Sequence, residues 1–257
     1  MSVVVLLSLA HAGLLDSLDE PSRHLAGCQQ AAADAESVDP QRAVGVWEAC
    51  LGEADRLGYA ELLPGLRAQV AVEKAWAAAA PRFVTDPHHA AMEVLAVAAR
   101  WSTADLPTDL VTRTFRGWME TDEGRAYVED VRTVSVTWEG GPDPRVDEVL
   151  RKAVQDVGLK WVSPGDPAAD TLIAAHLEVS HDAGAASAQG QLVVTRTGLV
   201  FDKVRVRARD ATLKGFTVSA SAESPTAAEA DAASLKVSAE AAARTLLHRV
   251  LGVLFKG

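Results

Sequence analysis

Two cysteines are the residues of this sequence whose type and spacing most directly suggest chemistry. Cys28 and Cys50 are the only cysteines in the chain. An even number of cysteines in an exported protein favours a disulfide. Two buried free thiols, packed as small hydrophobic side chains, are the alternative. A catalytic thiol is disfavoured because apolar surroundings raise the pKa of a thiol.

The segments around the cysteines predict a helical hairpin. Residues 22–36 and 41–58 each carry an apolar stripe at helical spacing, and the intervening Asp39-Pro40 is typical of a helix start. Cys28 and Cys50 are nearly equidistant from this turn, and both lie on the inner faces of the helices. In an antiparallel hairpin, such residues lie at the same height. We therefore predict a Cys28–Cys50 disulfide that links the two helices.

A strand rich in basic residues is the second candidate site. Residues 202–210 alternate valine or alanine with basic residues, and this period of two predicts a half-buried strand. Its exposed face would carry Lys203, Arg205, Arg207 and Arg209, with Arg196 added from the preceding strand. Such a face could bind an acidic protein partner, an anionic ligand or lipid headgroups. The alternative is a solvated sheet face with cross-strand pairs to Glu178 or Glu223.

Histidines provide only weak evidence for catalysis or metal binding. His89 and Glu93 are spaced like two metal ligands on a helix, but no third ligand of matching pattern follows. A hydrolase would have to use His176 or His181. The run Ser180-His181-Asp182 is no evidence for a triad, because consecutive strand residues point to opposite sides.

Motifs that would name an activity are missing from the sequence. It contains no G-x-S-x-G, P-loop, dinucleotide-binding glycine motif or Cys-x-x-Cys. We therefore expect a non-enzymatic protein with no cofactor and no metal.

Charge is distributed unevenly along the 257 residues. Residues 1–130 contain 10 Lys and Arg against 20 Asp and Glu, whereas residues 131–257 contain 15 of each. This asymmetry predicts two domains: an α-helical domain over residues 20–130 and an α+β domain over residues 131–257. The acidic balance disfavours nucleic acid as a partner, because phosphate binding requires a basic surface.

The α+β domain is predicted from changes in hydrophobic period. Period-two segments predict strands, and apolar stripes at helical spacing predict two helices. The strands would cover residues 131–138, 159–162, 169–180, 190–197, 202–210 and 215–223, and the helices residues 143–158 and 227–255. We expect a mixed or antiparallel sheet with the two helices packed on one face.

This layout resembles a group of small domains in bacterial envelope assembly proteins. A helix ending in Gly158 leads to a short strand, and Ala169-Asp170 then opens a longer strand. The pattern over residues 131–250 is similar to the TolB N-terminal, CsgG and LpoB-type domains, although the loop 210–215 departs from their usual turn. The resemblance implies a periplasmic, non-catalytic domain that binds other envelope proteins. The helices of residues 20–80 resemble tetratricopeptide-type hairpins, without a second copy at a fixed period.

The first residues resemble an export signal. A short apolar run closes with Ala10-His11-Ala12, which predicts a signal peptide over residues 1–12, although no Lys or Arg precedes the run. We therefore expect a periplasmic or secreted adaptor that binds other envelope proteins. Binding of an anionic ligand or of lipid headgroups at the membrane surface is the alternative, and a hydrolase is a third hypothesis.

Overall fold

The computed structural model describes two compact units, which divide after Thr121. The described residues are 19–101, 108–129, 131–140, 143–164, 166, 169–187, 190–206 and 211–255. The predicted signal peptide, residues 1–12, lies outside them, as do Arg207 and Arg209. The boundary between the units falls nine residues before the domain boundary expected from the sequence, because the short helix at residues 122–128 groups with the second unit.

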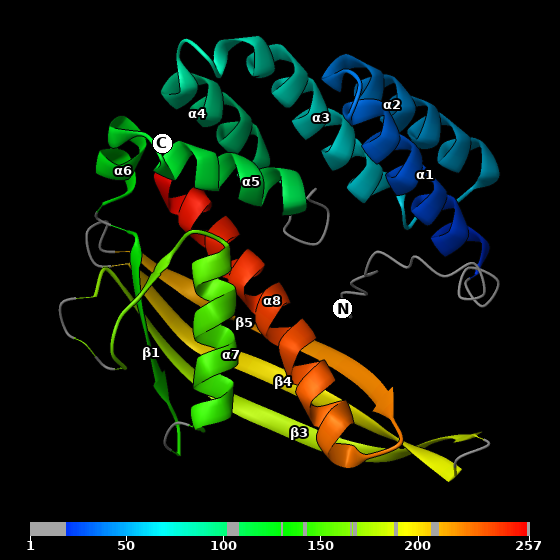
Figure 1. Ribbon diagram of the computed structural model, residues 1–257, viewed down its shortest axis with the longest axis vertical. Helices are drawn as coiled ribbons and strands as arrows, with labels where there is room; N and C mark the ends of the chain where they lie inside the picture. Colours follow the sequence, from blue (N-terminus) through cyan, green and yellow to red (C-terminus); the bar gives the residue numbers. More distant parts are fainter. Residues whose placement is uncertain are drawn as a thin grey trace. The chain divides into compact units, whose positions relative to one another are not determined.

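The first unit is helical (Figure 1). Its elements are α1 (Glu20–Glu36), α2 (Pro40–Leu57), α3 (Leu63–Ala79), the short 3-10 helix η2 (Ala80–Arg82), α4 (Pro87–Ala98) and α5 (Thr108–Met119). Each of the first three α-helices packs against the next along the chain. Buried alanine, valine and leucine side chains let these helices approach closely, and Trp47, Phe115 and Trp118 fill the larger spaces.

Local capping residues set the start of the helices, as the sequence predicts. The Asp39 carboxylate accepts a hydrogen bond from the Gln41 N–H, and Pro40 occupies the first turn of α2. Asp86 accepts from the His89 N–H at the start of α4. Glu120 and Thr121 separate α5 from α6 (Asp122–Val128).

The second unit is a sheet with two helices on one face, which confirms the predicted α+β class. After α6 come β1 (Thr133–Trp138), α7 (Pro144–Asp156), β2 (Lys160–Trp161), β3 (Thr171–Ser187), β4 (Gly190–Val206), β5 (Ala211–Ser224) and α8 (Ala227–Leu254). Figure 1 shows α7 and α8 beside each other across the same face of the sheet. We call this face the inner face and the opposite one the outer face.

The sheet is mixed. Its strand order is β2-β1-β3-β4-β5. β1 pairs in parallel with β2 and β3, and β3 pairs antiparallel with β4, as does β4 with β5. The parallel connection from β1 to β2 runs through α7, which turns back after Gly158 in a left-handed backbone conformation (φ 94°). The core lies between the inner face and the two helices, where Phe201 stacks on Phe216.

Two features of the strands differ from the sequence prediction. Residues 190–197 and 202–206, expected in two separate strands, belong to one long strand, β4, which includes the intervening residues 198–201. β5 begins at Ala211, so that most of the expected loop 210–215 is strand. Val179 is 46% exposed because it lies on the part of β3 that extends toward the hairpin tip.

Asp170 joins the starts of two neighbouring strands. Its carboxylate accepts hydrogen bonds from the backbone N–H and the hydroxyl of Thr133, and its own N–H donates to the Thr133 hydroxyl. These bonds satisfy polar groups at the point where β3 enters the sheet beside β1. The Ala169-Asp170 pair singled out in the sequence therefore has a structural role in this chain.

We expect Asp170→Ala to lower the free energy of unfolding by about 1 to 2 kcal/mol, because it leaves partly buried donors without their acceptor. Denaturant unfolding of the full chain measures this. Glu148→Ala, on the exposed side of α7, is the control and should change stability by less than about 0.5 kcal/mol. Equal unfolding midpoints for the two variants would show that the Asp170 hydrogen bonds contribute no net stability.

Candidate functional site

The outer face of the sheet is the surface that the two helices leave uncovered. It carries the charged side chains His176 and Glu178 from β3, Arg196, Asp202 and Arg205 from β4, and Lys214 from β5. Apolar partners in the same strands, such as Ile173, Val204 and Val206, point to the core and are buried. The alternation predicted for the basic strand is therefore present at Val204, Arg205 and Val206.

A β-bulge brings Arg196 and Arg205 to the same face. They are nine positions apart, and in a regular strand an odd spacing would place them on opposite faces. In the structure Ala175 pairs with Phe201 and Ala174 with Lys203, so that Asp202 is an extra residue in β4. One extra residue reverses the alternation beyond it. The sequence predicts Arg196 on this face from a separate preceding strand; instead Arg196 belongs to the same strand as Arg205, and the bulge places both on one face.

The predicted basic surface is described only in part. Arg196 and Arg205 are exposed on the outer face, and Lys203 belongs to β4 at a position opposite Ala174. The Lys203 side chain, Arg207 and Arg209 lie outside what the structure describes. Lys214, which pairs with Lys203 across β4 and β5, extends the surface onto the edge strand and was missed in the sequence analysis. Because the sequence indicates a loop over residues 210–215, it predicts no strand position for Lys214.

Carboxylates share this face with the basic residues. Glu178 pairs with Gly198 and is diagonal to Arg196, and Glu223 is diagonal to Arg196 from the other side. His176 Nδ1 lies 3.0 Å from Asp202 Oδ2, and His176 Nε2 lies 3.6 Å from Glu178 Oε1. The hydrogen bond to Asp202 is the main cause that raises the pKa of His176. The outer face is therefore a mixture of both signs of charge.

The two histidines of the hydrolase hypothesis do not come together. His176 projects from the outer face, whereas His181 Nε2 bonds to Asp231 Oδ1 of α8 at 2.8 Å. The Thr195 hydroxyl donates to the same Asp231 oxygen. In a catalytic triad the hydroxyl would bond to the histidine and the histidine to the acid. Here hydroxyl and histidine both bond to the acid, which is the arrangement of a structural contact.

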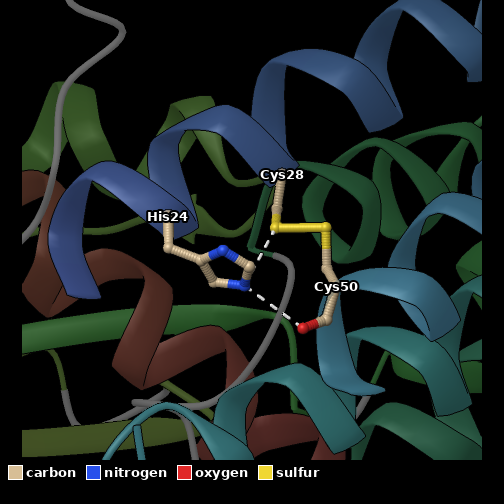
Figure 2. Close-up of side chains that lie close together, drawn as sticks. All are labelled: His24, Cys28 and Cys50. Atoms are coloured by element: carbon tan, nitrogen blue, oxygen red, sulfur yellow. Dashed lines mark hydrogen bonds between the residues drawn. A yellow bond between two sulfur atoms is a disulfide. The ribbon is translucent and has the colours of Figure 1, made fainter. Parts of the chain in front are cut away.

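The predicted disulfide links the first two helices of the helical unit (Figure 2). Cys28 of α1 and Cys50 of α2 have Cα atoms 6.0 Å apart, and the bridge belongs to the hydrophobic cluster that contains Trp47 and Leu66. Figure 2 also shows His24, which the sequence analysis missed. Its Nε2 lies 3.2 Å from the Cys50 carbonyl oxygen and 3.6 Å from Cys28 Sγ. His24 and Cys28 are four residues apart on one helix, and this spacing in the sequence indicates that their side chains are neighbours.

The histidines of the helical unit are held by other side chains. The Trp118 indole N–H donates to His88 Nδ1 at 2.9 Å, and His89 Nδ1 lies 2.9 Å from the Asp86 carboxylate. Glu93 forms an ion pair with Arg82 and does not join His89 as a second ligand for a metal ion. The His89–Glu93 spacing therefore serves local contacts.

A buried carboxyl group, Glu73 of α3, was also missed. Glu73 is 5% exposed, and one of its carboxylate oxygens has no hydrogen-bond partner among the described residues. Burial, together with the nearby negative charge of Glu36, raises the pKa of Glu73 to about 7, although Arg113 and Trp47 act in the opposite direction. A glutamate inside an alanine-rich helix gives no sequence signal of burial, because its neighbours come from other helices.

No protein-family model matches the sequence, and no curated protein matches it significantly. Among the residues that the structure describes, no helix is both long enough and apolar enough to cross a membrane.

Proposed function

We propose that this chain is an exported, non-enzymatic protein of the cell envelope that acts as an adaptor, and that the outer face of its sheet binds another envelope protein. The observation that carries the proposal is the outer face left uncovered by the two helices, on which the bulge places Arg196 on the same side of the sheet as Arg205 and Lys214. Sheets in proteins of this size ordinarily bury one face and can leave the other available for contacts.

The mixed charge of the outer face favours a protein partner over a lipid surface. Glu178 and Asp202 lie among the basic residues, and each would be repelled by an anionic bilayer. A protein can match both signs, with carboxylates opposite the arginines and basic groups opposite the two carboxylates. We therefore commit to a largely acidic protein segment as the bound partner and treat anionic lipid as the competing outcome.

Export is supported by two independent features. The apolar run that ends with Ala10-His11-Ala12 has the pattern of a signal peptide. The second feature is the Cys28–Cys50 disulfide, because disulfides persist mainly in oxidising compartments outside the cytosol. The resemblance of residues 131–250 to TolB N-terminal, CsgG and LpoB-type domains points to the same compartment and to the same class of role.

The decisive experiment combines crosslinking in the native cells with charge reversal. Tagged full-length protein is crosslinked in intact envelopes, and the co-purified proteins are identified by mass spectrometry. We expect a reproducible envelope partner, and we expect Arg196→Glu with Arg205→Glu to reduce its recovery at least tenfold, because reversed charges repel the acidic segment. The matched control is Arg151→Glu with Lys152→Glu, the same charge change on the exposed side of α7.

Two results would contradict the proposal. Equal loss of the partner in the outer-face variant and the α7 variant would show that net charge, and not this surface, determines binding. Retained partner together with lost binding to vesicles containing anionic lipid would assign the outer face to lipid headgroups.

A further inference from the structure

Three potential metal ligands from adjacent strands converge on the outer face. They are Glu139, which directly follows β1, His176 of β3 and Asp202 of β4. One ligand atom from each side chain lies within 4.8 Å of the others. His176 is about one-third exposed at 31% of its side chain, so the group is shielded on one side by the sheet and open to solvent on the other.

The sheet itself positions these side chains. Trp138 pairs with Ala175 in the parallel ladder, and the Glu139 N–H continues it by donating to the Ala175 carbonyl oxygen at 2.9 Å. Glu139 therefore lies beside His176 on the same face. Asp202 is the extra residue of the β4 bulge, and the bulge directs its carboxylate toward His176 Nδ1.

Gly215 allows the bulge to form. A Cβ atom at this position would lie 2.4 Å from the Phe201 carbonyl oxygen and 2.6 Å from the Asp202 carbonyl oxygen, which is closer than real Cβ atoms come. Only glycine lets β5 follow β4 so closely at the level of Asp202. The backbone conformations of β4 and β5 therefore determine the position of the Asp202 carboxylate.

The second nitrogen of His176 has its own orienting partner. Its Nε2 lies 3.6 Å from Glu178 Oε1. With the proton on Nε2, the lone pair of Nδ1 is directed toward the Asp202 carboxylate. Histidines that bind metals commonly donate their other N–H to a carboxylate in this way.

We propose that Glu139, His176 and Asp202 form a site for a divalent transition metal ion of the zinc class, with Glu178 orienting the imidazole. One imidazole and two carboxylates suit Zn²⁺ better than Mg²⁺ or Ca²⁺, which prefer oxygen ligands alone. Two carboxylate charges balance the charge of the ion. Three protein ligands leave at least one coordination position open, and this position faces the surface assigned above to partner binding. The metal site does not depend on that assignment.

The test is zinc binding to the full-length oxidised protein, freed of metal with a chelator and titrated with Zn²⁺ in a calorimeter. We expect one zinc ion to bind, and we expect His176→Ala and Asp202→Asn each to weaken binding at least tenfold, because changing even the outer-shell partners of metal ligands typically costs about 10- to 100-fold in affinity. Co²⁺ in place of Zn²⁺ adds a spectroscopic signature of imidazole ligation, which should disappear in His176→Ala.

The helical unit supplies a matched control. His89 and Asp86 form a histidine–carboxylate pair at 2.9 Å, against 3.0 Å for His176 and Asp202, and the nearby Glu93 is already paired with Arg82. We expect His89→Ala to bind Zn²⁺ as the unchanged protein does. Failure of the unchanged protein to bind Zn²⁺ would overturn the proposal, and so would equal binding by His176→Ala and the unchanged protein. A circular dichroism spectrum of each variant verifies folding.

Discussion

Reduction of the Cys28–Cys50 disulfide is expected to destabilise the helical hairpin by about 3 kcal/mol. The bridge closes a segment with a sequence separation of 22, and constraining a loop of this length in the unfolded chain contributes a free energy of that order. The contact between α1 and α2 would remain, but the unfolded hairpin would gain the conformational freedom that the bridge removes.

Hydrogen exchange measured by mass spectrometry, with and without reductant, tests this prediction on unmodified residues. Peptides from α1 and α2 should exchange roughly a hundredfold faster after reduction, which is the factor that about 3 kcal/mol represents. Peptides from β4 serve as the internal control, because β4 belongs to the other unit. Unchanged exchange in α1 and α2 would show that packing alone holds the hairpin.

Raising the pH is expected to destabilise the helical unit through Glu73. The pKa of its carboxyl group is about 7 in the folded protein against an ordinary value of 4.5, because burial disfavours the charged form. A raised pKa means that the folded state binds its proton more tightly than the unfolded state does. The resulting stability is fully present below pH 4.5, is lost progressively as the pH rises toward 7, and is absent above it. The difference corresponds to about 3 kcal/mol.

Neutral glutamine at this position removes the titration. We expect Glu73→Gln to be more stable than the unchanged protein at pH 8 by about 2 kcal/mol, and close to it in stability at pH 4.5. Urea unfolding at several pH values, monitored by tryptophan fluorescence, measures both curves. Trp47 and Trp76 lie in the same unit and report on it.

Glu53, which is exposed on α2 and pairs only loosely with Arg56, is the matched control. Glu53→Gln should retain the pH dependence of the unchanged protein. Parallel curves for Glu73→Gln and the unchanged protein would mean that the Glu73 carboxyl titrates in the folded protein as it does in the unfolded one.

Glu73 lies in a region where several buried side chains from neighbouring helices interact, so its ionisation acts on more than one helix. Four buried polar atoms without hydrogen-bond partners among the described residues lie on three helices of this unit: one Glu73 oxygen, Trp47 Nε1, Trp76 Nε1 and Thr114 Oγ1. Arg113 lies over the Trp76 ring and also pairs with Glu36, whose charge acts on Glu73. Ionisation of Glu73 therefore affects contacts between α1, α3 and α5.

Local sequence was sufficient for most of the elements and for the disulfide. Capping residues such as Asp39 and Asp86 and the apolar period of each segment act over a few residues, and a linear pattern displays them directly. The Cys28–Cys50 pairing followed from the same local rules, because a hairpin with a short turn brings nearby residues together. The α+β class with two helices on one face followed from the order of periods along the chain.

Tertiary structure alone decided where the charged groups meet. The bulge at Asp202 depends on a close approach of β5 at Gly215, and it places Arg196 and Arg205 on one face and Asp202 beside His176. The burial of Glu73 likewise depends on side chains from other helices. These contacts join residues far apart in the chain, and a pattern of period two or 3.6 carries no information about an extra residue or about a neighbour from another element.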